Sequence, residues 1–223
     1  KTNGSAEKIC TLIHRVRPAA WRLDYPTDVD IEEIFHDPAM PERSLLWLGV
    51  NGDPCAYAFL HFPYNNLNLE ASEECWTDAW EDEVTAWAEA QMRAQYGTDV
   101  VNQTLDGSCR SEDANMTRFF RRHGFEKDGI ESLTYELCLS GLPALPVLPE
   151  GFSLRPLQPD SELAEVVALH QAAHGTENFT LEERLAIMST PEYLPGLDLV
   201  AVAPDGTLAG NCICGLSGAD GSE

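Results

Sequence analysis

The chain has 223 residues, of which 37 are Asp or Glu and 14 are Lys or Arg, so its formal net charge is −23. Nucleic-acid binding depends on cationic side chains at phosphates, and docking on an anionic membrane needs the same charges, so this balance argues against both partners. Hydrophobic residues make up 43% of the chain, which is ample for packed cores. We expect an acidic, globular, cytoplasmic protein.

Cysteine usage and hydropathy support the same interpretation. The seven cysteines are an odd number without Cys-x-x-Cys spacing, which predicts reduced thiols rather than a disulfide framework. The longest apolar stretches, such as residues 45–48, are too short to span a bilayer, and the sequence does not open on a signal peptide.

A proline-rich stretch divides the chain. Residues 141–150 read GLPALPVLPE, and three prolines in ten residues preclude a helix or a central strand because each removes a backbone donor and fixes φ. We therefore predict a domain over 1–140, a linker over 141–150 and a second segment over 151–223.

In the first domain, helical spacing of apolar residues and a hairpin signal at Asn51-Gly52-Asp53-Pro54 predict alternating elements. The expected elements are helices over 5–17 and 28–35, strands over 44–50, 55–62 and 67–70, a helix over 81–96 that ends at Gly97, a strand over 99–104, a helix over 111–123 and a strand over 130–139. This order indicates an α/β fold with a mixed sheet.

The second segment begins the same order again. The expected elements are a strand over 152–155, helices over 161–174 and 181–188, and a hairpin over 199–203 and 207–216 around Pro204-Asp205-Gly206. The given sequence ends where the first domain continues into its central helix. We therefore expect residues 151–223 to form the N-terminal half of a second, similar domain.

This succession resembles the GNAT superfamily of acyl-CoA-dependent N-acyltransferases, in the tandem form of mycothiol synthase and its relatives. Residues 118–126, RFFRRHGFE, with Asn115 before them, are similar to the late helix and turn written Asn-x-x-Ala-x-x-x-Tyr-x-x-x-Gly-Phe in that family. Residues 151–156, GFSLRP, resemble the opening strand of such a domain, and residues 181–216 resemble its early helix and hairpin.

The resemblance implies a GNAT-like fold and acetyl-CoA as co-substrate. It implies transfer of an acetyl group to an amine of a small molecule or peptide, and an acidic acceptor pocket would attract a cationic amine. It further implies that the backbone of Leu67, Asn68 and Leu69 pairs with pantetheine and that Asn115 belongs to the cofactor site. The catalytic residues are not assigned.

Two departures from the family pattern predict a degenerate first domain. The family's pyrophosphate turn, Gln/Arg-x-x-Gly-x-Gly/Ala, uses glycines that let backbone N–H groups converge on the anion. The corresponding residues 70–80, EASEECWTDAW, contain no glycine and place Glu70, Glu73, Glu74 and Asp78 where phosphates would sit. The late helix has Phe120 where the family often has a tyrosine general acid, and phenylalanine has no proton to give.

His170-Gln-Ala-Ala-His174 places two imidazoles at i and i+4, which is a metal-ligand spacing. Gln171 stands where a zincin has its Glu, and the sequence offers no third ligand, so we favour a helix that faces an acceptor cleft or solvent over a metal site. In GNAT domains this region walls the acceptor pocket. We therefore predict that His170, His174 and Glu177 contact the substrate.

Two further groups have simpler interpretations. Cys212 and Cys214 alternate with Ile213 on one strand face, and we favour two buried apolar side chains over a reactive pair. Arg118, Arg121 and Arg122 could contact a nucleotide phosphate, but among so many acids we expect them to form salt bridges.

Three functions stay open. The favoured one is a GNAT-like N-acetyltransferase with a non-catalytic first domain. The alternative is a non-catalytic GNAT-like binding or scaffolding protein, favoured by the lack of an intact pyrophosphate turn. A metal-dependent hydrolase that uses His170 and His174 would need bound zinc. For the assembly, a homodimer is an open alternative.

Overall fold

The computed structural model describes residues 1–129, 135, 137, 139–141, 144–145, 147–191 and 193–215. It divides the chain into two compact units, Lys1–Thr134 and Tyr135–Glu223. The predicted strand over 130–139 falls mostly on residues outside the described ones. Within the described ranges, no helix is both long enough and apolar enough to cross a membrane.

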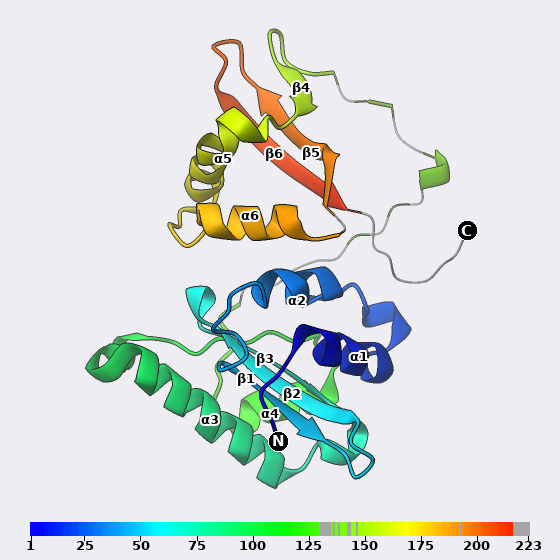
Figure 1. Cartoon of the computed structure of the whole chain (residues 1–223), viewed down its shortest axis with the longest axis vertical. Coiled ribbons are helices and arrows are strands. Elements are labelled where there is room, and N and C mark those ends of the chain that lie inside the picture. The colour runs from blue at the N-terminus through cyan, green and yellow to red at the C-terminus, as the bar shows by residue number, and fades with distance from the viewer. Residues whose placement is uncertain are drawn as a thin grey trace. The chain divides into compact units, whose positions relative to one another are not determined.

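The first unit is built around an antiparallel sheet of three strands in the order β1 (Ser44–Leu48), β2 (Pro54–His61) and β3 (Asn66–Ala71). Helices α1 (Ala6–Val16) and α2 (Asp28–Ile34) cover one face, and α3 (Asp78–Tyr96) and α4 (Ala114–Arg122) cover the other (Figure 1). The unit therefore has a helix layer on each side of its sheet.

The central strand β2 explains this layering. Ala56, Ala58 and Leu60 alternate toward the α3 and α4 side, whereas Tyr57 and Phe59 point toward α1 and α2. All five are fully buried. A strand that is hydrophobic at successive positions must be covered on both faces, because neighbouring side chains point to opposite sides of the sheet.

Side-chain caps set the helix boundaries. Thr27 and Asp30 form a capping box at the start of α2, and Thr77 caps α3 by accepting a hydrogen bond from the Trp80 N–H at 3.3 Å. Helix α3 thus begins three residues before the predicted start of 81. It ends at Gly97, whose φ of 55° is a backbone conformation that favours glycine.

The predicted strand over 99–104 is wrong. Residues Gly97–Asn102 form a 3₁₀ helix, in which the Asp99 carboxylate accepts hydrogen bonds from Asn102 at 2.7 Å and Gln103 at 3.2 Å. These local hydrogen bonds outcompete the strand preference of the two neighbouring valines.

The second unit has a sheet in the order β4 (Ser153–Pro156), β5 (Tyr193–Val202) and β6 (Leu208–Gly215). Helices α5 (Pro159–His174) and α6 (Leu181–Ser189) lie beside it (Figure 1). The small core contains residues from the sheet, from α5 and from the segment before α5: Leu157, Val166, Val200 and Leu208.

A buried charge cluster joins α6 to β5. Arg184 and Asp198 form an ion pair with side chains 1% and 0% exposed. The Asp198 carboxylate also accepts hydrogen bonds from the Tyr193 hydroxyl at 2.7 Å and from Asn211 Nδ2 at 3.0 Å. Burial and the hydrogen bond to Asp198 raise the pKa of Tyr193 to about 12. The Asp198 carboxylate thus has three hydrogen-bond donors, which offset the cost of removing its charge from water.

Candidate functional site

The candidate site lies where the edge of β3 separates from the chain segment before α4. A parallel bridge pairs Asn66 with Asp106, and the Leu67 N–H donates to the Asp106 carbonyl at 2.7 Å. Gly107 follows at close range, since a Cβ there would lie 2.7 Å from the Phe120 ring. Beyond this point the two segments diverge, and a cavity of about 660 Å³ opens between them.

The cavity is lined by four segments of the first unit. The first segment comprises the end of α1 and the chain that follows it, within residues 15–26. The second runs along β3 and into the following loop, within residues 67–76. The third leads into α4, within residues 108–116, and Tyr57 from β2 completes the lining. Its volume is in the usual range for small-molecule sites.

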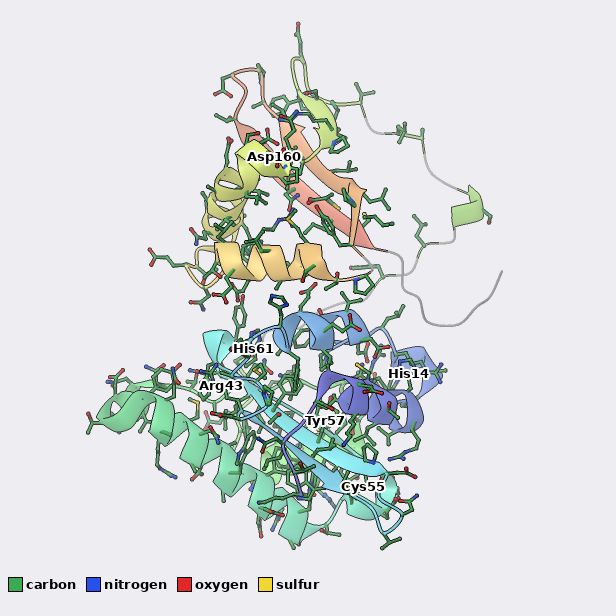
Figure 2. All side chains as sticks on the ribbon, in the orientation of Figure 1. His14, Arg43, Cys55, Tyr57, His61 and Asp160 are labelled. Atoms are coloured by element: carbon green, nitrogen blue, oxygen red, sulfur yellow. The ribbon has the colours of Figure 1, made fainter. Side chains whose placement is uncertain are left out.

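One wall of the cavity is a buried ion pair. Arg17, which ends α1, donates from Nε to Glu70 on β3 at 3.1 Å, and from Nη1 to the Asp24 and Pro26 carbonyls at 2.7 and 3.0 Å. Glu70 also accepts from the hydroxyl of Tyr57, which is labelled on β2 in Figure 2. Burial raises the pKa of Glu70, and the Arg17 guanidinium opposes that shift.

A second ion pair also lines the cavity. Arg110 donates from Nε and Nη2 to the two carboxylate oxygens of Asp24, with Nη2 at 2.7 Å. Its guanidinium lies 5.5 Å from the centre of the Trp21 ring. This bidentate pair fixes the segment after α1 against the segment before α4.

In the loop after β3, three backbone N–H groups have partners inside the loop. Those of Cys75, Trp76 and Thr77 donate to the Ser72, Glu73 and Cys75 carbonyls at 2.8 to 3.4 Å. These three groups are therefore not directed at a ligand. That the first unit lacks a working pyrophosphate turn stays a prediction.

The four acids predicted near the phosphate position differ in their surroundings. Glu70 lines the cavity, and its carboxylate pairs with Arg17. Asp78 also has a neighbouring cation, Arg122, at 4.0 Å. Glu73 and Glu74 are the acids of the loop that line the cavity.

The predicted cofactor residues come together around the cavity, which is lined by Leu67, Asn68, Leu69 and Asn115. Alternate residues of a strand direct their backbone groups to the same side, so the N–H and C=O of Leu69 point away from β2, as the Leu67 N–H does. The role of these residues in cofactor binding stays a prediction.

Phe120 on the late helix α4 belongs to an aromatic cluster. Its ring packs against the rings of Phe119 and Phe125, with centroid distances of 5.5 and 4.9 Å.

The predicted salt bridges of α4 are confirmed for two arginines. Arg118 pairs with the buried Glu81, and Arg122 contacts Glu81 at 3.2 Å.

The predicted substrate residues lie in the second unit. His170 and His174 are on α5 with ring centroids 4.4 Å apart, and the His170 ring also contacts Phe179 at 4.0 Å. Glu177 follows in the loop before α6. Burial, helped by His174 and Arg184, lowers the pKa of His170. Among the described residues, no three His, Cys, Asp or Glu side chains are placed to hold a metal ion.

The expectation of two buried cysteines on β6 is wrong. Cys212 and Cys214 are exposed, with their sulfur atoms 3.9 Å apart. The reason is the register of the sheet. Asn211 faces Asp198 on the side of the helices, so the alternating cysteines point to the opposite side.

Sequence reasoning missed the side chains that shape the cavity, namely Arg17, Asp24, Tyr57 and Arg110. Their side-chain partners are 13 to 86 residues away in the chain. The one local signal was the alternation along β3, which separates Glu70 from the apolar Leu69 and Ala71.

Comparison with solved structures identifies a similar fold in the crystal structure of a GCN5-related N-acetyltransferase from Sphaerobacter thermophilus. The TM-score is 0.60 at 18% sequence identity, and the alignment covers 97% of this chain and 71% of that one. No family model matches the sequence. No curated protein matches it either. The chain therefore has an α/β fold of the GNAT type.

Proposed function

We propose that the protein is an acetyl-CoA-dependent N-acetyltransferase of the tandem GNAT form, cytoplasmic, with a non-catalytic first unit. The proposal is supported by the fold likeness to an N-acetyltransferase over 97% of the chain.

In the proposed reaction, an unprotonated amine attacks the thioester carbonyl of acetyl-CoA. Backbone N–H groups stabilise the negative charge on the carbonyl oxygen. Collapse of the intermediate forms the amide and expels the CoA thiolate, while the amine loses its proton to a base and the thiolate gains one. Phe120 can supply no such proton, and the N–H groups of Cys75, Trp76 and Thr77 are already used. We therefore assign the transfer step to the second domain.

For the acceptor we assign His170, His174 and Glu177. The support is that the lowered pKa of His170 keeps its imidazole neutral near pH 7, so it can accept a hydrogen bond from an ammonium. In the active protein, His170→Ala is expected to raise KM for the amine with little change in kcat. A fall in kcat without a change in KM would contradict this assignment.

Calorimetric titration with acetyl-CoA tests the proposal. It is carried out on this chain and on the protein extended through any coding sequence that follows Glu223, and transfer to amines is followed by thiol release. Binding and transfer by the extended protein alone support a cofactor site in the second domain. Micromolar binding by residues 1–223 would contradict a non-catalytic first unit.

The alternative is a non-catalytic binding or scaffolding protein with a GNAT-type fold. It is favoured by the loop after β3, where the N–H groups of Cys75, Trp76 and Thr77 donate to carbonyls of the loop itself. If neither form binds acetyl-CoA, this alternative replaces the transferase.

A further inference from the structure

We propose that Cys55 and Cys75 are a redox-active pair, which hydrogen peroxide oxidises to a disulfide that tethers the loop after β3 to the start of β2. This inference goes beyond the proposed acetyl transfer and does not depend on it, because the pair lies in the unit to which we assign no catalysis. It gives the first unit a modification site and names the oxidant that acts there.

The backbone brings the two cysteines to one place. Cys55 is the second residue of β2, and the N–H of Ser72, which follows β3, donates to the Cys55 carbonyl at 2.8 Å. The chain then turns back through the 3₁₀ helix Glu73–Cys75, in which the Cys75 N–H donates to the Ser72 carbonyl at 2.9 Å. Cys55 and Cys75 therefore both lie beside Ser72.

The side chains of the pair also interact. Burial, together with a hydrogen bond to the Cys75 thiol, raises the pKa of the Cys55 thiol to about 11. The Ser72 hydroxyl donates to the Cys75 sulfur at 3.4 Å. A disulfide requires that the two side chains point toward each other, and thiols in contact meet this requirement. Both cysteines are partly exposed, so a small oxidant can reach them.

A second cysteine pair shows which arrangement suits a disulfide less well. The sulfurs of Cys212 and Cys214 are 3.9 Å apart, but the two residues lie on the same strand, β6. A strand rises about 3.3 Å per residue, so their Cα atoms are about 6.6 Å apart, near the upper limit for a disulfide. Cys55 and Cys75 belong to different segments that a turn folds together, so the rise of one strand does not hold them apart.

The reaction balances with one molecule of hydrogen peroxide. The raised pKa keeps Cys55 protonated at neutral pH, so we assign the first step to Cys75. Its sulfur attacks a peroxide oxygen, the O–O bond breaks, and a sulfenic acid and water form. The Cys55 sulfur then attacks the Cys75 sulfur, and the leaving hydroxide takes the Cys55 proton as a second water. Two thiols lose two electrons, which reduce the peroxide.

The disulfide acts on the cavity of the first unit. Ser72, Glu73, Glu74 and Trp76, which lie on either side of Cys75 in the chain, all line that cavity. A covalent link from Cys75 to β2 removes conformations in which the loop leaves the sheet. Oxidation therefore fixes one wall of the cavity, and reduction releases it.

The test is peptide mapping of this chain after treatment with hydrogen peroxide, with free thiols blocked and no reductant present. Cleavage at glutamate separates the two cysteines, because Glu70, Glu73 and Glu74 lie between them. We expect a linked pair of peptides that contains Cys55 and Cys75, lighter by two hydrogen atoms than the separate peptides. Dithiothreitol is expected to release them. Absence of this linked pair would overturn the proposal.

Matched serine variants locate the bond. Cys55→Ser and Cys75→Ser are each expected to abolish the linked pair, whereas Cys212→Ser, which changes an exposed cysteine of the second unit, is expected to leave its yield unchanged. Oxidation of the unaltered protein is expected to raise the midpoint of thermal unfolding of the first unit by about 5–10 °C. The same shift in Cys55→Ser or Cys75→Ser would contradict the assignment.

Hydrogen exchange measures the effect on the cavity wall. The amides of Trp76 and Thr77 are expected to exchange about tenfold or more slowly after oxidation and to regain their original rates after reduction. Equal rates in the two forms would overturn the tether. Acetyl-CoA titration reports on the transferase separately, because formation of the disulfide requires no acyl donor.

Discussion

Each unit hides one charged pair between a helix and a strand, but the two pairs are enclosed to different degrees. Arg17 and Glu70 border the cavity of the first unit, and the Glu70 side chain is 22% exposed. Arg184 and Asp198 in the second unit are almost completely enclosed. In both, a tyrosine hydroxyl shares the carboxylate.

The difference in solvent exposure indicates a different structural role for each ion pair. An enclosed pair must be satisfied by the protein itself, because desolvated charges that lose a partner have no water to replace it. A pair at a cavity wall can exchange contacts with solvent or a ligand. The Arg184–Asp198 pair therefore holds α6 to β5. The Arg17–Glu70 pair joins the end of α1 to β3 and forms part of a surface that a ligand can reach.

The largest expected effect comes from breaking the enclosed pair. Asp198→Ala leaves Arg184 uncompensated and is expected to lower the free energy of unfolding of the second unit by about 3–5 kcal/mol. Glu70→Ala is expected to cost less, about 1–3 kcal/mol, because water in the cavity can solvate Arg17. Chemical denaturation with hydrogen exchange of β5 and β3 amides measures both. Equal costs would contradict the comparison.

A control for that experiment is Arg155→Ala. Arg155 pairs with Glu162 near the surface, with side chains 31% and 12% exposed. Loss of this pair is expected to cost no more than about 1 kcal/mol. A larger loss would show that burial does not decide the ranking.

The two units also differ in how their sheets are covered. Leu46 and Leu60 are fully buried on opposite faces of the first sheet, so each substitution by alanine is expected to cost about 2–5 kcal/mol. Leu154 on β4 is 54% exposed, and Leu154→Ala is expected to change stability by less than about 0.5 kcal/mol. Urea denaturation of the three variants measures these free energies of unfolding. An unchanged stability on substitution of either buried leucine would contradict the prediction.

Two further expected effects are small and depend on pH. Burial, with a smaller contribution from Asp30, raises the pKa of Glu33 to about 7. The folded state therefore keeps a proton that the unfolded chain loses above its ordinary carboxyl pKa, so this group costs stability as pH rises through 7. Glu33→Gln is expected to raise the free energy of unfolding by about 1 kcal/mol at pH 8, after allowance for solvent screening, and to have no effect near pH 4.

The contribution of His170 in the second unit to the pH dependence of stability has the opposite sign. Its pKa is lowered, so the unfolded chain binds a proton more readily, and stability is expected to fall as pH drops below the ordinary histidine pKa. Unfolding curves of unaltered protein and His170→Gln between pH 5 and 8 measure this. An identical pH dependence of the two proteins would contradict it.

Local patterns predicted much of the fold. The amphipathic spacing of Ile9, Leu12 and Ile13, the hairpin at Gly52 and the glycine that ends α3 each act within a few residues, so the sequence displays them directly. The strand predicted at 99–104 failed because Asp99 makes side-chain hydrogen bonds that favour a 3₁₀ turn.

The candidate site was less predictable. The four expected cofactor residues do lie around one cavity, because β3 and the start of α4 are neighbours in the fold. The ion pairs that build its walls were not predicted, since Arg17 and Arg110 find partners far along the chain and no local pattern marks them. Predicting that the cysteines on β6 are exposed would have required the register of the sheet, which the local sequence does not reveal.

The contact between Asp24 and Arg110 joins segments 86 residues apart. Closing so long a loop costs conformational entropy before the contact gains anything, so we expect it to form late in folding, after the sheet and α3 are in place. Asp24→Asn is then expected to speed unfolding while leaving the folding rate unchanged, and a slower folding rate would contradict this order. We therefore expect this wall of the cavity to be among the last features of the first unit to assemble and among the first to open.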